Sequence, residues 1–272
     1  MPKSFKNVLE TSLKTSKPIL AFNIQNMQQL KALAVASKKN NKNVIAQFSE
    51  KYFELFSKNF DFIKIKKHYK NYNVHFFLDH CTDKKKIIKA VNLKFDGVMY
   101  DGSNLDVLKN IKTTNQIYQI LKNKKTVLEA EIGIIPGQKD YGIKSKRLSL
   151  NFKDLEKFIK KAKFHILAIA AGNTHGLKNN KINLNLYKFA ISKNPKIKIV
   201  FHGASGIKFE YMKKIFKFNL VKVNYSSILK KEMNSLMNKF QKKNISFDQI
   251  NYDKFLEYNL AKFFSKIIKK YK

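Results

Sequence analysis

Three of the six histidines come directly after stretches of apolar residues, where the strands of a sheet would end. Neutral imidazole is a preferred ligand of zinc and related divalent ions, and three imidazoles with a carboxylate leave room for a substrate or water. One such histidine alone would more often be a hydrogen-bonded core or loop residue, but three at equivalent positions favour a metal site. They are His80, His175 and His202. The other three are interpreted as structural or surface residues: His68, His75 and His165.

The elements that must position these side chains are eight apolar runs, separated by stretches with helical periodicity. Several runs are continuously apolar, as is typical of parallel strands buried on both faces. The runs are Ile19–Phe22, Val44–Phe48, Val74–Leu78, Gly97–Tyr100, Val127–Ile132, Ile166–Ala170, Ile197–Phe201 and Leu220–Val223. Their spacing of about 20 to 40 residues predicts an α/β fold, a (β/α)8 TIM barrel. A doubly wound open sheet is the alternative, because periodicity alone does not exclude it.

Polar residues collect in these runs or just after them, and in a barrel the carboxyl ends of the strands carry the active site. Asp79 follows the third run, and Glu129 and Glu131 lie in the fifth. Gly203–Gly206 follows the seventh run, and Asn224–Ser227 follows the eighth. Backbone N–H groups in these last two loops are the usual phosphate site of such barrels, so an anionic ligand is expected.

The even composition along the chain predicts one domain over residues 1–272, because no break in composition resembles a linker. Thr82 or Asp83 is expected to cap the helix after the third run. Helical periodicity continues from about residue 228 as a C-terminal extension of the barrel. Within it, the polar segment Gln241–Asp253 is interpreted as a loop.

The net charge of +36 does not by itself predict a nucleic-acid partner. The basic residues are lysines spread along the whole chain, and only Arg147 offers the bidentate fork used in specific base recognition. The single cysteine, Cys81, gives no sign of an oxidising compartment. No signal-peptide pattern and no run of about 18 apolar residues occurs. A cytoplasmic protein without membrane or specific nucleic-acid partners is therefore expected, with a basic surface that attracts anionic substrates.

Seven motifs, ordered along the chain, resemble those of the class II, metal-dependent fructose-bisphosphate aldolases and their tagatose-bisphosphate relatives. They are AFN (Ala21–Asn23), LDH (Leu78–His80), DGS (Asp101–Ser103), EAEIG (Glu129–Gly133), GNTHG (Gly172–Gly176), FHGASG (Phe201–Gly206) and KVN (Lys222–Asn224). The resemblance implies a lyase of glycolysis and gluconeogenesis. Such an enzyme cleaves fructose 1,6-bisphosphate reversibly to dihydroxyacetone phosphate and glyceraldehyde 3-phosphate.

The resemblance also implies roles for individual residues. His80, His175 and His202 would bind one catalytic zinc ion per subunit. Glu131 would be a further ligand or a nearby carboxylate, and Asp79 would be the acid/base at the C4 hydroxyl of the sugar. The substrate would contact Asn23, Ser49, Gly176, Gly203, Ser205, Asn224, Ser226 and Ser227. A homodimer or homotetramer, and an additional monovalent cation, fit the same family pattern.

The main departure from that pattern lies in the loop after the fifth run, and the milder departures are at Glu50, Lys51, Cys81, Lys178 and Ser226. The family's loop glutamate, which handles the C3 proton of the triose, is replaced by Lys139, with Asp140 beside it. A protonated lysine is no base near neutral pH. Two alternatives therefore stay open: a tagatose 1,6-bisphosphate aldolase, whose substrate differs only at C4, and a catalytically weakened barrel that binds metal or phosphate. A Schiff-base aldolase using Lys222 is disfavoured, because converging histidines have no role in that chemistry.

Overall fold

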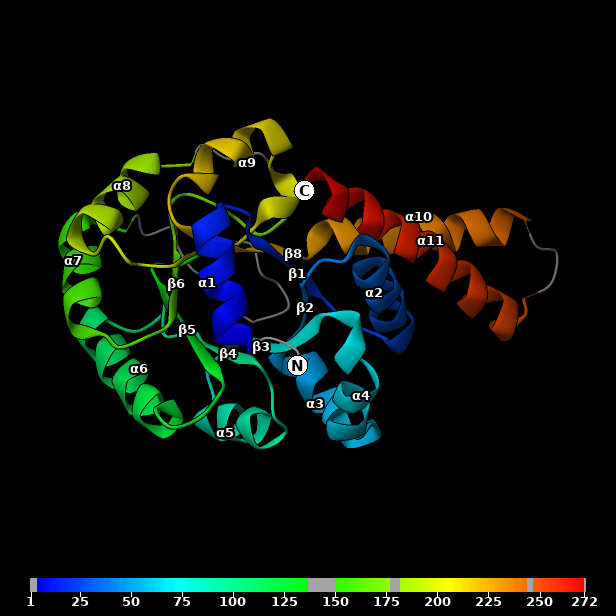
Figure 1. Cartoon of the computed structure of the whole chain (residues 1–272), viewed down its shortest axis with the longest axis horizontal. Coiled ribbons are helices and arrows are strands. Elements are labelled where there is room, and N and C mark those ends of the chain that lie inside the picture. The colour runs from blue at the N-terminus through cyan, green and yellow to red at the C-terminus, as the bar shows by residue number, and fades with distance from the viewer. Residues whose placement is uncertain (1–3, 137–149, 177–181, 244–246, 272) are drawn as a thin grey trace.

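The chain forms a closed barrel of eight parallel strands (Figure 1). The computed structural model describes residues 4–136, 150–176, 182–243 and 247–271. The strands follow one another around the barrel in sequence order, and β1 closes it by pairing with β8. They are β1 (Ile19–Asn23), β2 (Val44–Ser49), β3 (Val74–Cys81), β4 (Gly97–Tyr100), β5 (Val127–Ile132), β6 (Ile166–Ile169), β7 (Ile199–Phe201) and β8 (Leu220–Tyr225). The predicted TIM barrel is confirmed, and closure excludes the open sheet.

Helices between the strands form the outer layer of the barrel (Figure 1). They are α2 (Met27–Asn40), α3 (Glu50–Asn59), α4 (Phe62–His68), α5 (Lys84–Asn92), α6 (Val107–Leu121), α7 (Phe152–Lys161), α8 (Leu184–Lys193) and α9 (Phe209–Phe216), with short 3-10 turns at Lys70–Tyr72 and Ala204–Gly206. Side-chain caps fix several starts. At α5, for example, Asp83 accepts a hydrogen bond from the backbone N–H of Lys85, which satisfies a helix donor that otherwise lacks a partner.

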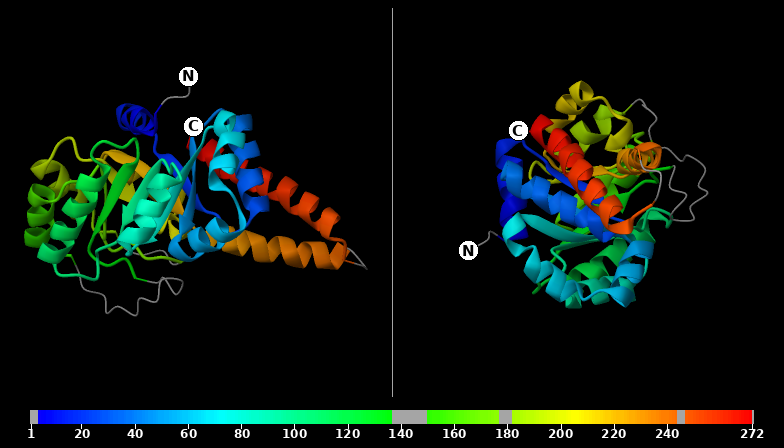
Figure 2. Two further views of the ribbon diagram at one scale, coloured as in Figure 1. Left: turned by 90° about the horizontal axis from the view of Figure 1, so that it is seen from below. Right: turned by 90° about the vertical axis from the view of Figure 1, so that its right-hand side faces the viewer.

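A helix that precedes the first strand, α1 (Phe5–Thr15), lies across the amino-terminal end of the barrel (Figures 1 and 2). Its side chains Phe5, Val8 and Leu9 pack with apolar residues from inside the barrel, such as Phe77 and Val200. The sequence reading did not include this helix, although its apolar residues recur at steps of three and four. Because α1 covers the amino-terminal end, that end of the barrel interior is an apolar core.

Two helices follow β8: α10 (Ser227–Lys243) leads away from the barrel and α11 (Gln249–Lys270) returns to it (Figures 1 and 2). The loop prediction for Gln241–Asp253 is wrong in extent, because both of its ends are helical. Asp248 starts α11 by accepting from the backbone N–H of Asn251. The polar composition reflects exposure of both helices rather than the absence of a helix.

The helix α11 packs against the outside of the barrel beside α2. The ring of Phe264 meets that of Phe22 edge to face, with centroids 4.9 Å apart. Asn40 donates a hydrogen bond to the hydroxyl of Ser265 at 3.1 Å. The hydroxyl oxygens of Tyr225 and Tyr271 lie 2.7 Å apart. This helix therefore covers the seam where the first and last strands meet.

His165 lies at the amino-terminal end of β6 and has a structural contact, as predicted. Its Nδ1 accepts a hydrogen bond from the backbone N–H of Leu128 at 3.0 Å, so this nitrogen carries no proton in the folded chain. Burial, helped by Lys6 and Lys198, lowers the pKa of His165 to about 4. In the unfolded chain the pKa is about 6.5. The folded chain therefore requires His165 in its neutral form.

The stability of the protein should accordingly fall as the pH drops from about 6.5 towards 4. Over this range the unfolded chain takes up a proton that the folded chain refuses. In His165→Asn, the amide oxygen still accepts from Leu128 but does not titrate. We expect the acid-induced fall in melting temperature to be about 2–4 °C smaller, which is roughly 1 kcal/mol for this partly buried ring. The same substitution at exposed His68 should leave the fall unchanged, and an equal fall in both variants would contradict the assignment.

Candidate active site

The residues proposed for the site lie at the carboxyl ends of the strands or in the loops that follow them, where parallel barrels place their active sites. The register brings neighbouring strands into line there. Asn23 pairs with Gln47, and Ser49 with Asp79. The others follow around the rim: His80 in β3, Glu131 in β5, His175 and Gly176 after β6, His202, Gly203 and Ser205 after β7, Asn224 in β8, and Ser226 and Ser227 where α10 begins.

The three predicted histidines are brought together. Nε2 of His80 lies 2.9 Å from Nδ1 of His202. The ring centroids of these two are 4.7 Å apart, and the ring of His175 lies 5.3 Å and 6.0 Å from them. One nitrogen from each ring falls within 4.8 Å of the others. Strand ends that are distant in sequence thus converge on one point.

The backbone of β3 is distorted at His80 to make this possible. Its φ of 45° lies in the left-handed region, which costs a residue other than glycine about 1 kcal/mol or more. The pairing of β3 with β4 also shifts register between Leu78 and Cys81. Bulges of this kind re-aim side chains at the rims of barrels. Here the bulge coincides with Asp79 and His80, the adjacent pair of predicted site residues.

Carboxylates surround His80 on its other side. Its Nδ1 lies 2.8 Å from Oδ2 of Asp101 and 3.5 Å from Oε2 of Glu131. Asp101 is itself held by the hydroxyl of Ser103 at 2.6 Å. The three residues His80, Asp101 and Glu131 form a second group whose ligand atoms lie within 4.8 Å. Asp101 belongs to the DGS motif but was not among the predicted site residues. Its position directly after the fourth apolar run was the available signal.

The pKa shifts of the histidines and carboxylates indicate that the cluster favours an added positive charge. Burial lowers the pKa of His175 and of His202 well below the usual value, so both rings are neutral, the form that binds a metal. Burial also raises the pKa of Glu131. For His80, burial lowers the pKa, but Asp79, Glu131 and Asp101 outweigh it and raise the pKa to about 10. The carboxylates therefore favour a cation at their centre.

Asp79 is oriented by side-chain amides from three other strands. The Asn23 amide donates to Oδ2 at 2.7 Å, and the Gln47 amide approaches the same oxygen at 3.2 Å. The Asn224 amide lies 3.5 Å from Oδ1. Gln47 also donates to the amide oxygen of Asn23 at 2.8 Å, which links the donors to one another. The Asp79 carboxylate is therefore held in a fixed position beside the imidazoles.

The loops after β6, β7 and β8 are tied together. Gly203 has a φ of 76°, and a side chain there would place Cβ 2.3 Å from the carbonyl oxygen of Thr174, so only glycine fits. The Asn173 amide donates to the carbonyl oxygen of His202 at 3.0 Å. The hydroxyl of Ser205 accepts from the backbone N–H of Ser226 at 3.3 Å. These contacts hold the two candidate phosphate loops next to the histidines.

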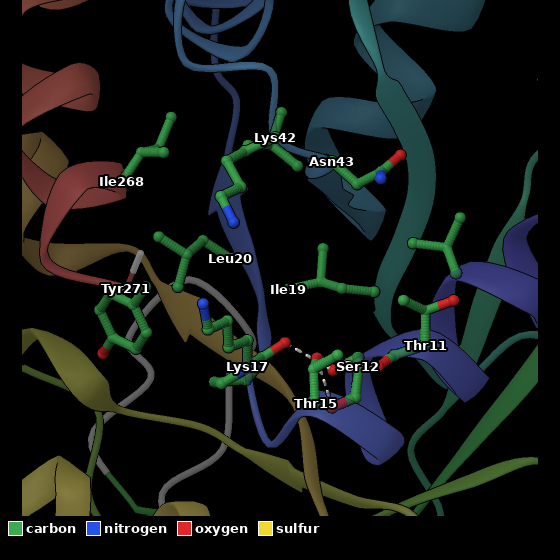
Figure 3. A pocket seen from close by; sticks show the side chains of 13 residues that line it. Thr11, Ser12, Thr15, Lys17, Ile19, Leu20, Lys42, Asn43, Ile268 and Tyr271 are labelled. Atoms are coloured by element: carbon green, nitrogen blue, oxygen red, sulfur yellow. Dashed lines mark hydrogen bonds between the residues drawn. The ribbon is translucent and has the colours of Figure 1, made fainter.

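A cavity of about 310 Å³ lies at the opposite end of the strands, between α1, the start of β1 and the end of α11 (Figure 3). Figure 3 shows the ammonium groups of Lys17 and Lys42 near the side chain of Leu20, on the side away from the hydroxyls of α1. Neither imidazole nor carboxylate groups are among its described lining residues. Among the described residues, this cavity therefore lacks the imidazole and carboxylate ligands that the rim gathers for a metal ion.

Lys139, which stands where the family has its loop glutamate, and its neighbour Asp140 lie outside the described residues, as does Lys178. Lys222, by contrast, is well placed in the structure. It is fully buried inside the barrel, its ammonium 2.7 Å from Oε2 of Glu129. An ammonium buried against a carboxylate is not available as a nucleophile, which agrees with the interpretation against a Schiff base.

Barrel and rim together have the architecture of a TIM-barrel enzyme with a candidate metal centre. The family model of class II fructose-bisphosphate aldolases matches residues 3–272, and the chain belongs to this family. It is therefore an aldolase, a lyase of a metal-dependent family that acts on sugar phosphates.

Two curated relatives illustrate the range of this family. The chain is 32% identical over 230 residues to a fructose-bisphosphate aldolase of Ureaplasma parvum, covering 82% of this chain and 78% of the relative. It is 29% identical over 231 residues to a 6-phospho-5-dehydro-2-deoxy-D-gluconate aldolase of Bacillus subtilis, covering 82% and 79%. The structure of fructose-bisphosphate aldolase from Campylobacter jejuni has the same fold, with a TM-score of 0.78, 21% identity, and coverage of 98% and 93%.

In the part of the chain that the structure describes, no helix is long and apolar enough to cross a membrane.

Proposed function

We propose that the chain is a zinc-dependent aldolase that reversibly cleaves fructose 1,6-bisphosphate to dihydroxyacetone phosphate and glyceraldehyde 3-phosphate. The observation that carries this proposal is the convergence of His80, His175 and His202 beside buried carboxylates, within a chain of the class II family. The name of the Ureaplasma parvum relative supports the choice of sugar.

The donor set of the site fits a divalent metal. Three imidazole nitrogens within 4.8 Å of one another, from His80, His175 and His202, match the ligands of catalytic zinc sites. Oε2 of Glu131 is buried and has no hydrogen-bond partner among the described residues, as a further ligand or a nearby counter-charge for the ion would require. When bound, the ion would supply Lewis acidity for the sugar carbonyl.

Asp79 is proposed to take the proton of the C4 hydroxyl. As this proton leaves, the C4 oxygen forms the aldehyde of glyceraldehyde 3-phosphate and the C3–C4 bond breaks. The electron pair of that bond remains on the C1–C3 half as an enediolate, which becomes dihydroxyacetone phosphate when C3 takes up one proton. The amides of Asn23, Gln47 and Asn224 hold the carboxylate in place for this transfer. A base already positioned at the reacting proton is what general base catalysis needs.

The substrate phosphates are proposed to bind at the loops after β7 and β8. Gly203 and Ser205 lie in the first of these loops, while Ser226 and Ser227 lie at the start of α10. Backbone N–H groups at a helix start attract phosphate oxygens. Asn23, Ser49, Gly176 and Asn224 complete the proposed set of substrate contacts around the rim.

The test is cleavage of fructose 1,6-bisphosphate by the purified chain, first as isolated, then after treatment with EDTA, and then after addition of zinc. We expect EDTA to abolish cleavage and zinc to restore it. Activity that resists EDTA would overturn the metal-dependent mechanism. Bound zinc without cleavage would favour a catalytically weakened barrel and point to Lys139.

Two further substrates belong in the same assay. Tagatose 1,6-bisphosphate differs only at C4, and the Bacillus subtilis relative is named for 6-phospho-5-dehydro-2-deoxy-D-gluconate. The preferred substrate is identified by the highest kcat/KM. A preference of tenfold or more for either alternative would replace fructose 1,6-bisphosphate in the proposal and leave its metal site intact.

A further inference from the structure

Behind His202, inside the barrel, lies a buried pair of opposite charges that the proposed reaction does not use. Glu129 of β5 and Lys222 of β8 are both fully buried. The Lys222 ammonium donates to Oε2 of Glu129 at 2.7 Å, and Oε1 of Glu129 lies 2.8 Å from Nε2 of His202. The three side chains thus form a continuous line from the barrel interior to the proposed metal centre.

Stability alone does not account for this pair. Removing two charges from water is costly, and replacing a buried ion pair with apolar residues of similar size is often neutral or stabilising. The interior around it is otherwise apolar, with Phe77 and Val200 in the same part of the barrel. A role at the site is a better explanation, because one end of the pair contacts His202.

The geometry also determines what each group can do. Lys222 is fixed by two contacts, since its ammonium lies 3.9 Å from the centre of the Phe77 ring as well as on Glu129. It holds Oε2, so Oε1 is presented to Nε2 of His202. The Asn224 amide nitrogen also lies 3.1 Å from that Nε2, but an N–H donor does not accept the imidazole proton. Glu129 is therefore the acceptor for Nε2–H.

We propose that Glu129, held by Lys222, is a positioning residue that fixes the ring of His202 with Nδ1 towards the metal site. With Nε2–H bonded to Glu129, the lone pair of Nδ1 faces the cluster, where it lies 2.9 Å from Nε2 of His80. Partners of this kind orient metal-binding histidines, and their loss commonly weakens metal affinity about 10- to 100-fold. The inference rests on the proposed role of His202 as a ligand.

The test compares two double variants that differ only in the acceptor opposite His202. Lys222→Met with Glu129→Gln removes both charges and keeps a side-chain oxygen near Nε2. Lys222→Met with Glu129→Leu also removes both charges and keeps the volume, but offers no acceptor. Zinc affinity is measured on the metal-free proteins by competition with a chromophoric chelator, and folding by melting temperature without metal.

We expect the Gln variant to bind zinc within about threefold of wild type and the Leu variant to bind it about 10- to 100-fold more weakly, at similar metal-free melting temperatures. Equal zinc affinity in both would overturn the inference and leave the pair a purely structural feature. A wild-type chain that fails to bind zinc would instead overturn the proposed function, so the two failures are distinguishable.

A single variant covers the case in which either double variant fails to fold. Glu129→Asp keeps the charge beside Lys222 but withdraws the carboxylate from His202 by one methylene group. Here we expect zinc affinity to fall about tenfold and the absorption spectrum of the cobalt-substituted protein to change. Unchanged affinity and spectrum in the folded variant would overturn the inference.

Discussion

Asp79→Asn should lower kcat for fructose 1,6-bisphosphate cleavage by about 10²- to 10⁴-fold, the usual contribution of a positioned general base. The substitution keeps the size of the side chain but removes its ability to accept the C4 hydroxyl proton. KM should change much less, because the phosphate loops and the histidines are untouched. Steady-state kinetics measure both kcat and KM, with long incubations sampled at fixed times where the activity is low.

Bound zinc and melting temperature distinguish this chemical role from damage to the site. Both should stay close to wild type in Asp79→Asn, because Asp79 is not proposed as a zinc ligand. Asp106→Asn is a matched control, since Asp106 is an exposed helix cap and asparagine caps equally well. It should leave kcat unchanged. A loss of less than tenfold in Asp79→Asn would rule out Asp79 as the base.

His175→Ala should remove both bound zinc and activity, with a fall in kcat/KM of about 10³-fold or more, because metal stabilisation of developing charge is worth several kcal/mol. His175 is the best of the three histidines for this test. It lies in the loop after β6 rather than in a strand, and its backbone N–H bonds to the carbonyl oxygen of Pro136 at 2.8 Å. Removing the side chain therefore leaves that contact and the barrel in place.

Elemental analysis of the purified variant gives zinc per chain, and the cleavage assay gives the activity. Excess zinc should restore part of the activity, because two imidazoles remain. His68→Ala serves as the control, since His68 is exposed and contacts tyrosines at the far end of α4. Full zinc content and full activity in His175→Ala would show that His175 is not a ligand.

The barrel could be predicted because its strands are continuous apolar runs. The runs Gly97–Tyr100 and Val127–Ile132 match β4 and β5 at both ends. The strand β3 continues three residues beyond the predicted Leu78, through Asp79 and His80 to Cys81. Polar residues in a strand interrupt the apolar pattern. In β3 the pattern therefore ends before Asp79 and His80, the two residues of this strand that belong to the site.

The site was predictable as a set of strand ends but not as a network of contacts. His80 and Asp101 come from neighbouring strands, and a carboxylate after the next run was a readable signal. The contact between Glu129 and Lys222 joins residues 93 positions apart across the barrel interior. Only closure of the barrel brings them together. In the sequence, Lys222 lies inside the apolar run Leu220–Val223, which places it in a strand but does not say which side chain it contacts.

The packing of α11 on the seam of the barrel has a consequence for how the protein is made. The register places Leu20 of β1 against Val223 of β8, and Phe264 then covers Phe22 on the outside. During translation β1 is made before its partner β8 and before α11. Until both have formed, the edge of β1 that pairs with β8 and its outer apolar face are exposed to other chains. Correct assembly therefore requires that the open edge of β1 does not pair with other chains before β8 and α11 have been made.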